Sequence, residues 1–196
     1  MRNIKVTLAY DGTNYFGFQE QRGTSFQTIQ GVVEESLSKL AKRRIRVIGA
    51  SRTDTGVHAR GQVINFHPGE WKIDGARVAY ALRSILPPDI VALESREVDP
   101  SFHARFSAVA KSYRYTILNS KTASPFLRLY SYHIPHPLDT EAMQEGAQYL
   151  LGEHDFRAFR ALGTPVRNTV RRLLEIRVSR EGDLVYIDLK GDGFLY

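Results

Sequence analysis

The segment Ser51–Gly61 (SRTDTGVHARG) combines residue types that could do chemistry. One carboxylate, Asp54, follows Arg52 by two residues and precedes Gly56. A D-T-G triplet is also ordinary turn chemistry, because an aspartate side chain accepts hydrogen bonds from nearby backbone N–H groups. The functional interpretation is that Arg52 holds the Asp54 carboxylate in its ionised form, as a nucleophile or a base, while Gly56 lets a ligand approach the backbone closely.

A second candidate site is the segment 111–117 (KSYRYTI). On a strand, Tyr113 and Tyr115 share one face, where they could pack in a core or stack on bases of RNA. Basic residues near this segment and near the end of the chain could contact phosphates, or could simply be solvated. These residues are Arg105, Lys111, Arg167, Arg171 and Arg172.

Other catalytic classes lack their signatures. The histidines, among them His58, His67 and His103, have neither the spacing nor the carboxylates of a metal site. The chain has no cysteine, which excludes disulfides and thiol catalysis. A lone acid argues against glycoside hydrolysis, and no Gly-rich phosphate loop or dinucleotide motif is present. The sequence therefore predicts neither a metal nor a cofactor.

The composition favours a polyanionic partner. The 196 residues carry a formal net charge of +6, and of the 27 basic residues 20 are arginine and 7 are lysine. Arginine suits phosphates and can stack on bases, although a GC-rich genome also favours arginine codons. No apolar run approaches the roughly 20 residues of a membrane span, and the N-terminus is typical of a strand rather than a secretory signal. These features predict a cytoplasmic protein.

The loop around Asp54 must be positioned by the elements on either side of it. Alternating apolar residues predict a strand at 4–10, and helical spacing predicts a helix that begins at Thr28. Two more strands are expected at 45–50 and 62–67, so that Ser51–Gly61 connects them and has a rigid mount. A second helix follows Asp74, and residues 90–98 form a strand. The inward residues of this helix are expected to be Val78, Ala81, Leu82 and Ile85.

The second half of the chain begins in the same way. A strand is expected at 109–118, a helix at 139–151, and a hairpin from 172–179 and 184–190. The two halves predict an α+β protein with RRM-like or ferredoxin-like (split βαβ) antiparallel sheets that form a central cleft. The expected domains are residues 1–104, which carry the Asp54 loop, and residues 105–196. The second half is one helix and one strand short of the first, which favours a fragment of a longer protein.

Several motifs resemble those of the tRNA pseudouridine synthase A family, the tRNA-uridine isomerases. The run from Arg52 to Ala59 (RTDTGVHA) is similar to the family's signature loop. Ser51, Thr55 and Phe18 stand where the family usually has glycine, alanine and tryptophan. Family members also continue past the last strand into a helix and a final strand. Other similar segments span nearly the whole chain: Tyr10–Gln19, Phe102–Ala108, Tyr113–Tyr115, Leu151–Phe156 and Gly193–Tyr196.

The resemblance implies isomerisation of uridine to pseudouridine in the anticodon stem-loop of tRNA, at positions 38 to 40. Such a reaction requires neither a cofactor nor a metal. Asp54 would be the essential carboxylate. Three alternative roles remain open for it: attack on C1′ of the sugar, addition to C6 of the uracil, or abstraction of a sugar proton. Arg52 would pair with Asp54 and occupy the space of the flipped base, while Tyr113 would stack on the uracil. The family is homodimeric, and both subunits contact one tRNA.

The alternative function is that of a non-catalytic RNA-binding module with RRM-like halves. In that case Tyr113 and Tyr115 would be stacking platforms. Asp54 distinguishes the two hypotheses, because an acid in a basic groove would repel phosphate and serve no purpose in a simple binding protein. A metal-dependent nuclease or phosphatase is a third possibility, and the lack of a ligand cluster argues against it.

Overall fold

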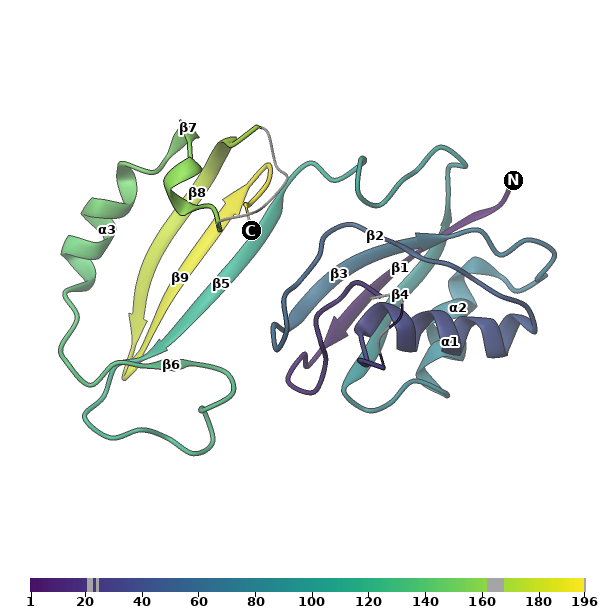
Figure 1. Ribbon diagram of the computed structural model, residues 1–196, viewed down its shortest axis with the longest axis horizontal. Helices are drawn as coiled ribbons and strands as arrows, with labels where there is room; N and C mark the ends of the chain where they lie inside the picture. The colour runs from purple at the N-terminus through teal and green to yellow at the C-terminus, as the bar shows by residue number, and fades with distance from the viewer. Residues whose placement is uncertain (21–22, 24, 162–167, 196) are drawn as a thin grey trace. The chain divides into compact units, whose positions relative to one another are not determined.

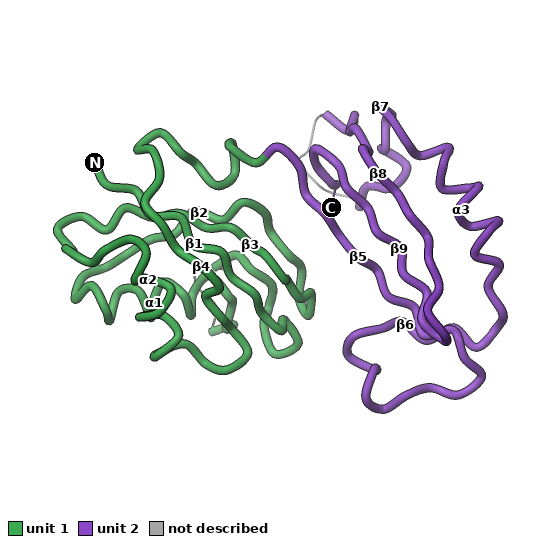
Figure 2. Tube along the Cα trace, turned by 180° about the vertical axis from the view of Figure 1, so that it is seen from behind, with its two compact units in different colours: residues 1–108 green, residues 109–196 purple. Residues whose placement is uncertain are grey.

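The computed structural model describes the chain except for residues 21–22, 24, 162–167 and 196. It consists of two compact units, Met1–Ala108 (unit 1) and Val109–Tyr196 (unit 2), which are coloured separately in Figure 2. The sequence placed the domain boundary after residue 104. The chain on both sides of this position is tied to unit 1, because the Ala104 N–H donates to Asn65 Oδ1 at 2.8 Å and the Ser107 N–H donates to the carbonyl of His103 at 2.8 Å.

Unit 1 has the β-α-β-β-α-β order expected from the sequence (Figure 1). Its sheet is antiparallel and has the strand order β2-β3-β1-β4. This is the split βαβ arrangement. Its elements are β1 (Asn3–Tyr10), α1 (Ile29–Ala41), β2 (Ile48–Gly49), β3 (Ala59–Phe66), the 3-10 helix η1 (Gly75–Arg77), α2 (Val78–Arg83) and β4 (Ile90–Val98).

The core of unit 1 lies between one face of this sheet and its two helices. Ile4, Val6 and Leu8 alternate along β1 and are fully buried, and Val33 of α1 and Leu82 of α2 pack in the same cluster. Each large aliphatic side chain buried in this way contributes roughly 1.5–3 kcal/mol. The end of this sheet is therefore a stiff support for the loop that carries Asp54.

Two predictions for unit 1 are partly wrong. The expected strand at 45–50 is reduced to β2, because side chains of α1 satisfy the backbone there. The Ile45 N–H donates to Ser38 Oγ at 2.9 Å, and the Val47 N–H donates to Glu34 Oε1 at 3.0 Å. The second helix ends at Arg83, so Ile85 is not an inward residue and is 36% exposed.

Unit 2 is built around a five-stranded sheet with the order β6-β5-β9-β8-β7, in which only the β5–β6 pair is parallel. The long hairpin turns at Gly182, whose φ of 59° favours glycine. The prediction of an α+β fold with two sheets is confirmed. The elements are β5 (Lys111–Leu118), β6 (Tyr132–His133), α3 (Thr140–Gln148), β7 (Gly152–Asp155), the 3-10 helix η2 (Arg157–Phe159), β8 (Val170–Glu181) and β9 (Leu184–Gly191).

The helix of unit 2 is shorter than expected, and it ends at Gln148 rather than at residue 151. Tight turns follow, in which the Tyr149 and Leu150 N–H groups donate to the carbonyls of Gly146 and Ala147. Figure 1 shows α3 beside β8, and Gln144 Oε1 accepts a 2.6 Å hydrogen bond from the backbone of Val178. None of the described helices is both long and apolar enough to cross a membrane.

Candidate active site around Asp54

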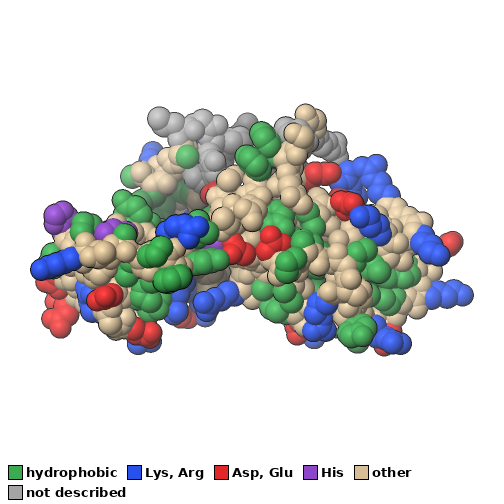
Figure 3. Space-filling view, turned by 90° about the horizontal axis from the view of Figure 1, so that it is seen from below, with side chains coloured by type: hydrophobic (Ala, Val, Ile, Leu, Met, Phe, Trp, Pro, Cys, Tyr) green, Lys and Arg blue, Asp and Glu red, His purple; other side chains and the backbone are tan. Residues whose placement is uncertain are grey.

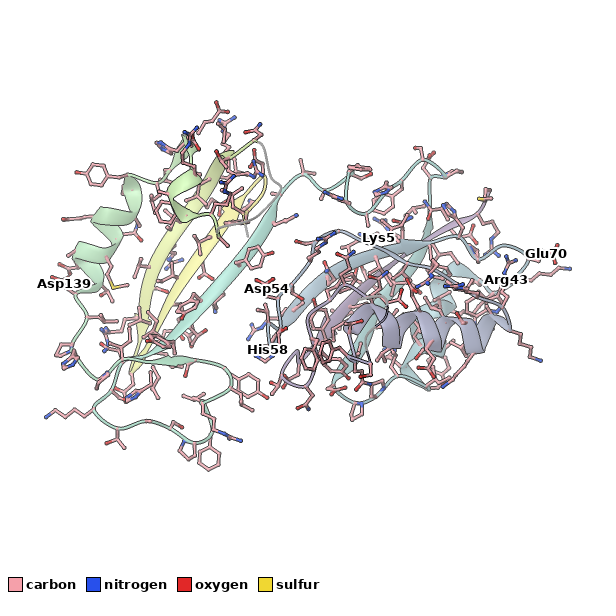
Figure 4. All side chains as sticks on the ribbon, in the orientation of Figure 1. Lys5, Arg43, Asp54, His58, Glu70 and Asp139 are labelled. Carbon is pink, nitrogen blue, oxygen red and sulfur yellow. The ribbon has the colours of Figure 1, made fainter. Side chains whose placement is uncertain are left out.

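The Asp54 side chain is exposed on the loop between β2 and β3. Figure 4 labels Asp54 and His58 on this loop. A turn forms at the acid, because the Val57 N–H donates to the carbonyl of Asp54 at 3.1 Å, and Gly56 within it has a φ of 77°. The interpretation that this segment connects two strands is correct for the residues up to His58, whereas Ala59–Gly61 already belong to β3.

The segment that follows β1 holds the Asp54 loop in place through hydrogen bonds. The Phe18 N–H donates to the carbonyl of Thr53 at 3.0 Å, and the Gly56 N–H donates to the carbonyl of Tyr15 at 3.3 Å. The hydroxyls of Tyr10 and Thr53 lie 2.8 Å apart. The backbone on both sides of Asp54 is therefore fixed to unit 1.

Two glycines allow this close approach. A Cβ on Gly12 would lie 2.0 Å from the carbonyl oxygen of Val57, so the backbone would have to shift to accept any side chain there. Gly17 has a φ of 76°, and a Cβ there would lie 2.6 Å from the carbonyl oxygen of Thr53. Sequence reasoning identified these glycines only as part of a family-like segment and gave them no role. The available signal was their spacing within Tyr10–Gln19.

His58 connects the end of the loop to the residues after β1. Its Nδ1 lies 3.1 Å from the Gly12 backbone nitrogen, from which it accepts a hydrogen bond, and 3.0 Å from Asp11 Oδ1. The two contacts require different protonation states, since Nδ1 accepts from Gly12 when it carries no proton and donates to Asp11 when it carries one. In either state His58 joins the loop to the start of the Asp11–Gly12 turn.

Tyr15 supports the same region from within the core. Its hydroxyl donates to Asp89 Oδ1 at 2.7 Å, and the Asp11 N–H donates to the Asp89 carbonyl at 2.9 Å. Burial, followed by the hydrogen bond to Asp89, raises the pKa of Tyr15 well above its ordinary value. Tyr15 therefore stays neutral and remains a hydrogen-bond donor.

Arg52 lies on the same loop, and its side chain is also exposed. The ion pairs within the described part of the chain do not include one between Arg52 and Asp54. The structure therefore brings the two residues onto one loop without the direct pairing expected from their spacing. Both side chains are accessible to a ligand.

Tyr113 belongs to unit 2 and lies on β5 opposite Leu189 of β9. Its ring meets that of Phe194 edge to face, with centroids 4.9 Å apart and an interplanar angle of 79°. Tyr115 is 51% exposed. Phe194 was not expected to be a site residue, although it lies in the Gly193–Tyr196 segment that resembles the family. Its contact with Tyr113 adds it to the candidates in unit 2.

The weaker candidates for RNA contacts are spread over both units. In unit 1, the Arg105 guanidinium lies 5.7 Å from the centroid of the Phe106 ring. In unit 2, Lys111 begins β5, and Arg171 Nη1 donates to the carbonyls of Asn168 and Val170 at 3.1 and 2.6 Å. Arg167 lies outside the described residues.

Two of the histidines lie within hydrogen-bonding distance of backbone carbonyls. His67 Nδ1 lies 3.0 Å from the carbonyl oxygen of Arg2, and His133 Nε2 lies 2.8 Å from that of Ser120. In the described ranges, no group of three or more histidine, aspartate or glutamate side chains is arranged to hold a metal ion.

Comparisons with known proteins identify the family. The family model described as tRNA pseudouridine synthase matches residues 7–107 and 147–196. The tRNA pseudouridine synthase A of Acetivibrio thermocellus is 48% identical over 196 residues, which are 100% of this chain and 79% of the relative. That of Moorella thermoacetica is 49% identical over 193 residues, 98% of this chain and 78% of the relative. The chain belongs to the tRNA pseudouridine synthase family.

Proposed function

We propose that this protein isomerises uridine to pseudouridine in the anticodon stem-loop of tRNA, at positions 38 to 40, with Asp54 as the essential carboxylate. The observation that carries the proposal is an exposed acid on a loop whose backbone is held on both sides, at Thr53 and at Gly56. Membership of the family supports the reaction and the class of substrate. The RTDTGVHA run supports the choice of Asp54.

The reaction is an isomerisation, so no atom is gained or lost. The N1–C1′ bond of the nucleoside breaks, C5 of the uracil bonds to C1′, and C5 loses a proton while N1 gains one. A target base must leave its stack to reach the acid, at a cost of a few kcal/mol. Asp54 then acts as a nucleophile or as a base in a position that is already fixed, which lowers the barrier by pre-organisation.

Arg52 is proposed to enter the space that the flipped base leaves and to pair with Asp54 in the complex with RNA. Its exposed side chain and its place two residues before the acid support this role. Tyr113 is proposed to stack on the uracil, and the edge-on Phe194 ring would fix the orientation of its ring. Arg105, Lys111 and Arg171 are weaker candidates for contacts with the RNA backbone. We further propose a homodimer that works in the cytoplasm and contacts one tRNA through both subunits.

The test is tritium release from tRNA that carries [5-³H]uridine, in buffer with EDTA, by the parent chain and by Asp54→Ala. Loss of the essential carboxylate should lower the rate by at least about a thousandfold. Thr55→Ala is the matched control, because Thr55 is the next residue, is also exposed, and should be dispensable.

The same experiment can contradict the proposal. If the parent binds tRNA but releases no tritium, and Asp54→Asn binds tRNA more tightly, the chain acts as an RNA-binding module. If Asp54→Ala retains the parent rate, another residue supplies the carboxylate.

A further inference from the structure

A group of unpaired cations lies at the end of α1. Lys42, Arg43 and Arg44 follow the helix, and Lys72 comes from the loop after β3. We call these four residues the basic end patch. All four side chains are exposed, and none takes part in an ion pair or side-chain hydrogen bond within the described part of unit 1. Together with Ala41, Glu70 and Trp71 they line a hollow of about 620 Å³.

Stabilisation of the helix does not account for this patch. A cation near a helix C-terminus interacts favourably with the helix dipole, and Lys39 already provides one in the last turn. The patch adds four positive charges against the single carboxylate of Glu70, a local sum of +3. Lys42 also has a left-handed backbone with a φ of 53°. The four positive charges of the basic end patch repel one another in the free protein, and a bound polyanion would relieve this repulsion.

The position of α1 determines how far the patch lies from Asp54. The helix begins next to the Asp54 loop, because the Ile29 N–H donates to the carbonyl of Gly17, which lies against Thr53. Its 13 residues rise about 1.5 Å each, so its other end is roughly 20 Å away. Figure 4 shows this separation, with Arg43 and Glu70 at one end of unit 1 and Asp54 and His58 at the other.

At that distance the patch cannot reach the phosphate of the nucleotide bound at Asp54. Since successive phosphates of one strand in a duplex lie about 3.4 Å apart along the axis, it would meet the backbone several nucleotides away. Figure 3 shows Lys and Arg side chains around the right-hand end of unit 1, with Asp and Glu side chains interspersed among them. A separation of roughly 20 Å between the patch and Asp54 therefore suits two contacts with one RNA.

We propose that the basic end patch is a second RNA-binding site, which holds the phosphate backbone of the tRNA outside the neighbourhood of the target uridine. The inference rests on the proposed function, because it takes tRNA as the substrate. The patch contributes affinity for the whole tRNA and takes no part in the chemical step. Trp71 is partly buried against the core and anchors the Lys72 segment.

The experiment compares Arg43→Gln/Arg44→Gln with the control Arg77→Gln/Arg83→Gln, which removes two exposed arginines elsewhere in unit 1. Lys42 is left unchanged, since its left-handed backbone ends α1. Pseudouridine formation is measured with full-length tRNA and with an isolated anticodon stem-loop, at several salt concentrations. For full-length tRNA, KM should rise about five- to tenfold with kcat unchanged, and the salt slope should fall by about 1 to 2. The stem-loop should show no change.

Each outcome decides one of the two proposals. An active parent whose KM for full-length tRNA is unaffected by the patch variant overturns the inference and leaves the proposed function intact. An equal effect in the control pair also overturns it, because the effect would then reflect net charge alone. A parent that is inactive on both RNAs contradicts the proposed function. Filter binding of tRNA then tests the patch without any need for activity. Equal affinities of the parent and of Arg43→Gln/Arg44→Gln for tRNA would overturn the inference about the patch. Equal melting temperatures confirm that the variants fold, and Arg43→Lys/Arg44→Lys should retain the parent KM.

Discussion

At the residue scale, backbone contacts rather than a partner for the carboxylate fix the position of Asp54. The carbonyl of Thr53 accepts from Phe18, and the N–H of Gly56 donates to Tyr15, so the chain is held one residue before the acid and two residues after it. The side chain itself remains exposed. A carboxylate on such a mount can meet a flipped base without having to order its own loop first.

The close packing of Gly12 against Val57 predicts that Gly12→Ala displaces the loop. An added methyl group would lie 2.0 Å from the Val57 carbonyl oxygen, and the obstacle is backbone, which cannot rotate away. We expect a loss of about 1–3 kcal/mol in stability and a fall in kcat of at least tenfold. Urea denaturation and tritium release measure the two effects. The control is Gly61→Ala on β3, where a Cβ has open space. A Gly12→Ala variant with parent kcat would show that the loop tolerates this displacement.

The hydroxyl of Tyr10 makes a smaller contribution. Tyr10→Phe removes the 2.8 Å contact with Thr53 Oγ1 and leaves the ring in the core, so about 0.5–1.5 kcal/mol of stability should be lost. The fall in kcat should stay below about tenfold, because the backbone hydrogen bonds of the loop remain. Tyr80→Phe on α2 is the matched control, since Tyr80 is exposed. A Tyr10→Phe loss no larger than that of the control would exclude an energetic role for the hydroxyl.

The sequence predicted the acid that we propose for this site but not its support. Asp54 and Arg52 are recognisable because their side-chain types and spacing imply chemistry. The support joins residues such as Tyr10 and Thr53, which are 43 positions apart, and much of it uses backbone atoms that every residue has. Residue types therefore carry little information about it. Conversely, Arg52 and Asp54 are close in sequence, and the ion pairs of the described residues include none between them.

At the element scale, periodicity predicted the elements with an alternating or amphipathic pattern. The strand at 90–98 has the expected bounds, and Thr28 is the N-cap of α1, where its side chain accepts from the Gly31 N–H. Two strands were missed. β6 has only two residues, and β7 (GEHD) is polar throughout, so neither has a hydrophobic period. The apolar 45–50 segment misled the prediction because its backbone bonds to side chains of α1.

The pairing of β5 with β9 includes one ion pair that predicts a pH dependence. Arg114 donates to both carboxylate oxygens of Asp188, at 2.7 and 2.8 Å, and this bond lowers the pKa of Asp188 below its ordinary value of 3.8. A lowered folded-state pKa means that the pair stabilises unit 2 above about pH 4. This stability is lost as the pH falls through the lowered pKa. Because the side chains are 48% and 36% exposed, the contribution should stay below about 1 kcal/mol.

Asp188→Asn should therefore destabilise unit 2 slightly at pH 7 and by less at pH 3, because the stability from the lowered pKa is lost progressively as the pH falls below 3.8. Urea denaturation of parent and variant at both pH values measures the difference. Asp183→Asn, in the turn of the same hairpin, controls for the loss of one exposed carboxylate. An Asp188→Asn deficit that persists unchanged in acid would mean that the charge of the pair is not its cause.

At the scale of the whole molecule, the two units have unequal cores. In the described residues, the clustered hydrophobic core lies entirely in unit 1 and includes large side chains such as Phe66, Ile29 and Leu37. The buried hydrophobic residues of unit 2 are Ile117, Leu118, Ala147, Leu173 and Val185. Since buried apolar area is the main source of folding free energy, unit 1 should be the more stable of the two. The residue proposed as essential thus lies on the more stable unit, while Tyr113 lies on the less stable one.

This inequality predicts the pattern of amide hydrogen exchange in the native protein. Backbone N–H groups of β5, β8 and β9 should exchange at least about tenfold faster than those of β1 and β3, because unit 2 opens without unit 1. Mass spectrometry of peptides from each unit measures the two rates, and an Asp54→Ala protein should show the same pattern, since that exposed side chain supports no core. Addition of tRNA should slow exchange in β5, where Tyr113 is proposed to hold the base, more than in β1. Equal protection of both units without RNA would mean that they unfold together, and the buried residues of each unit would then no longer account for its stability.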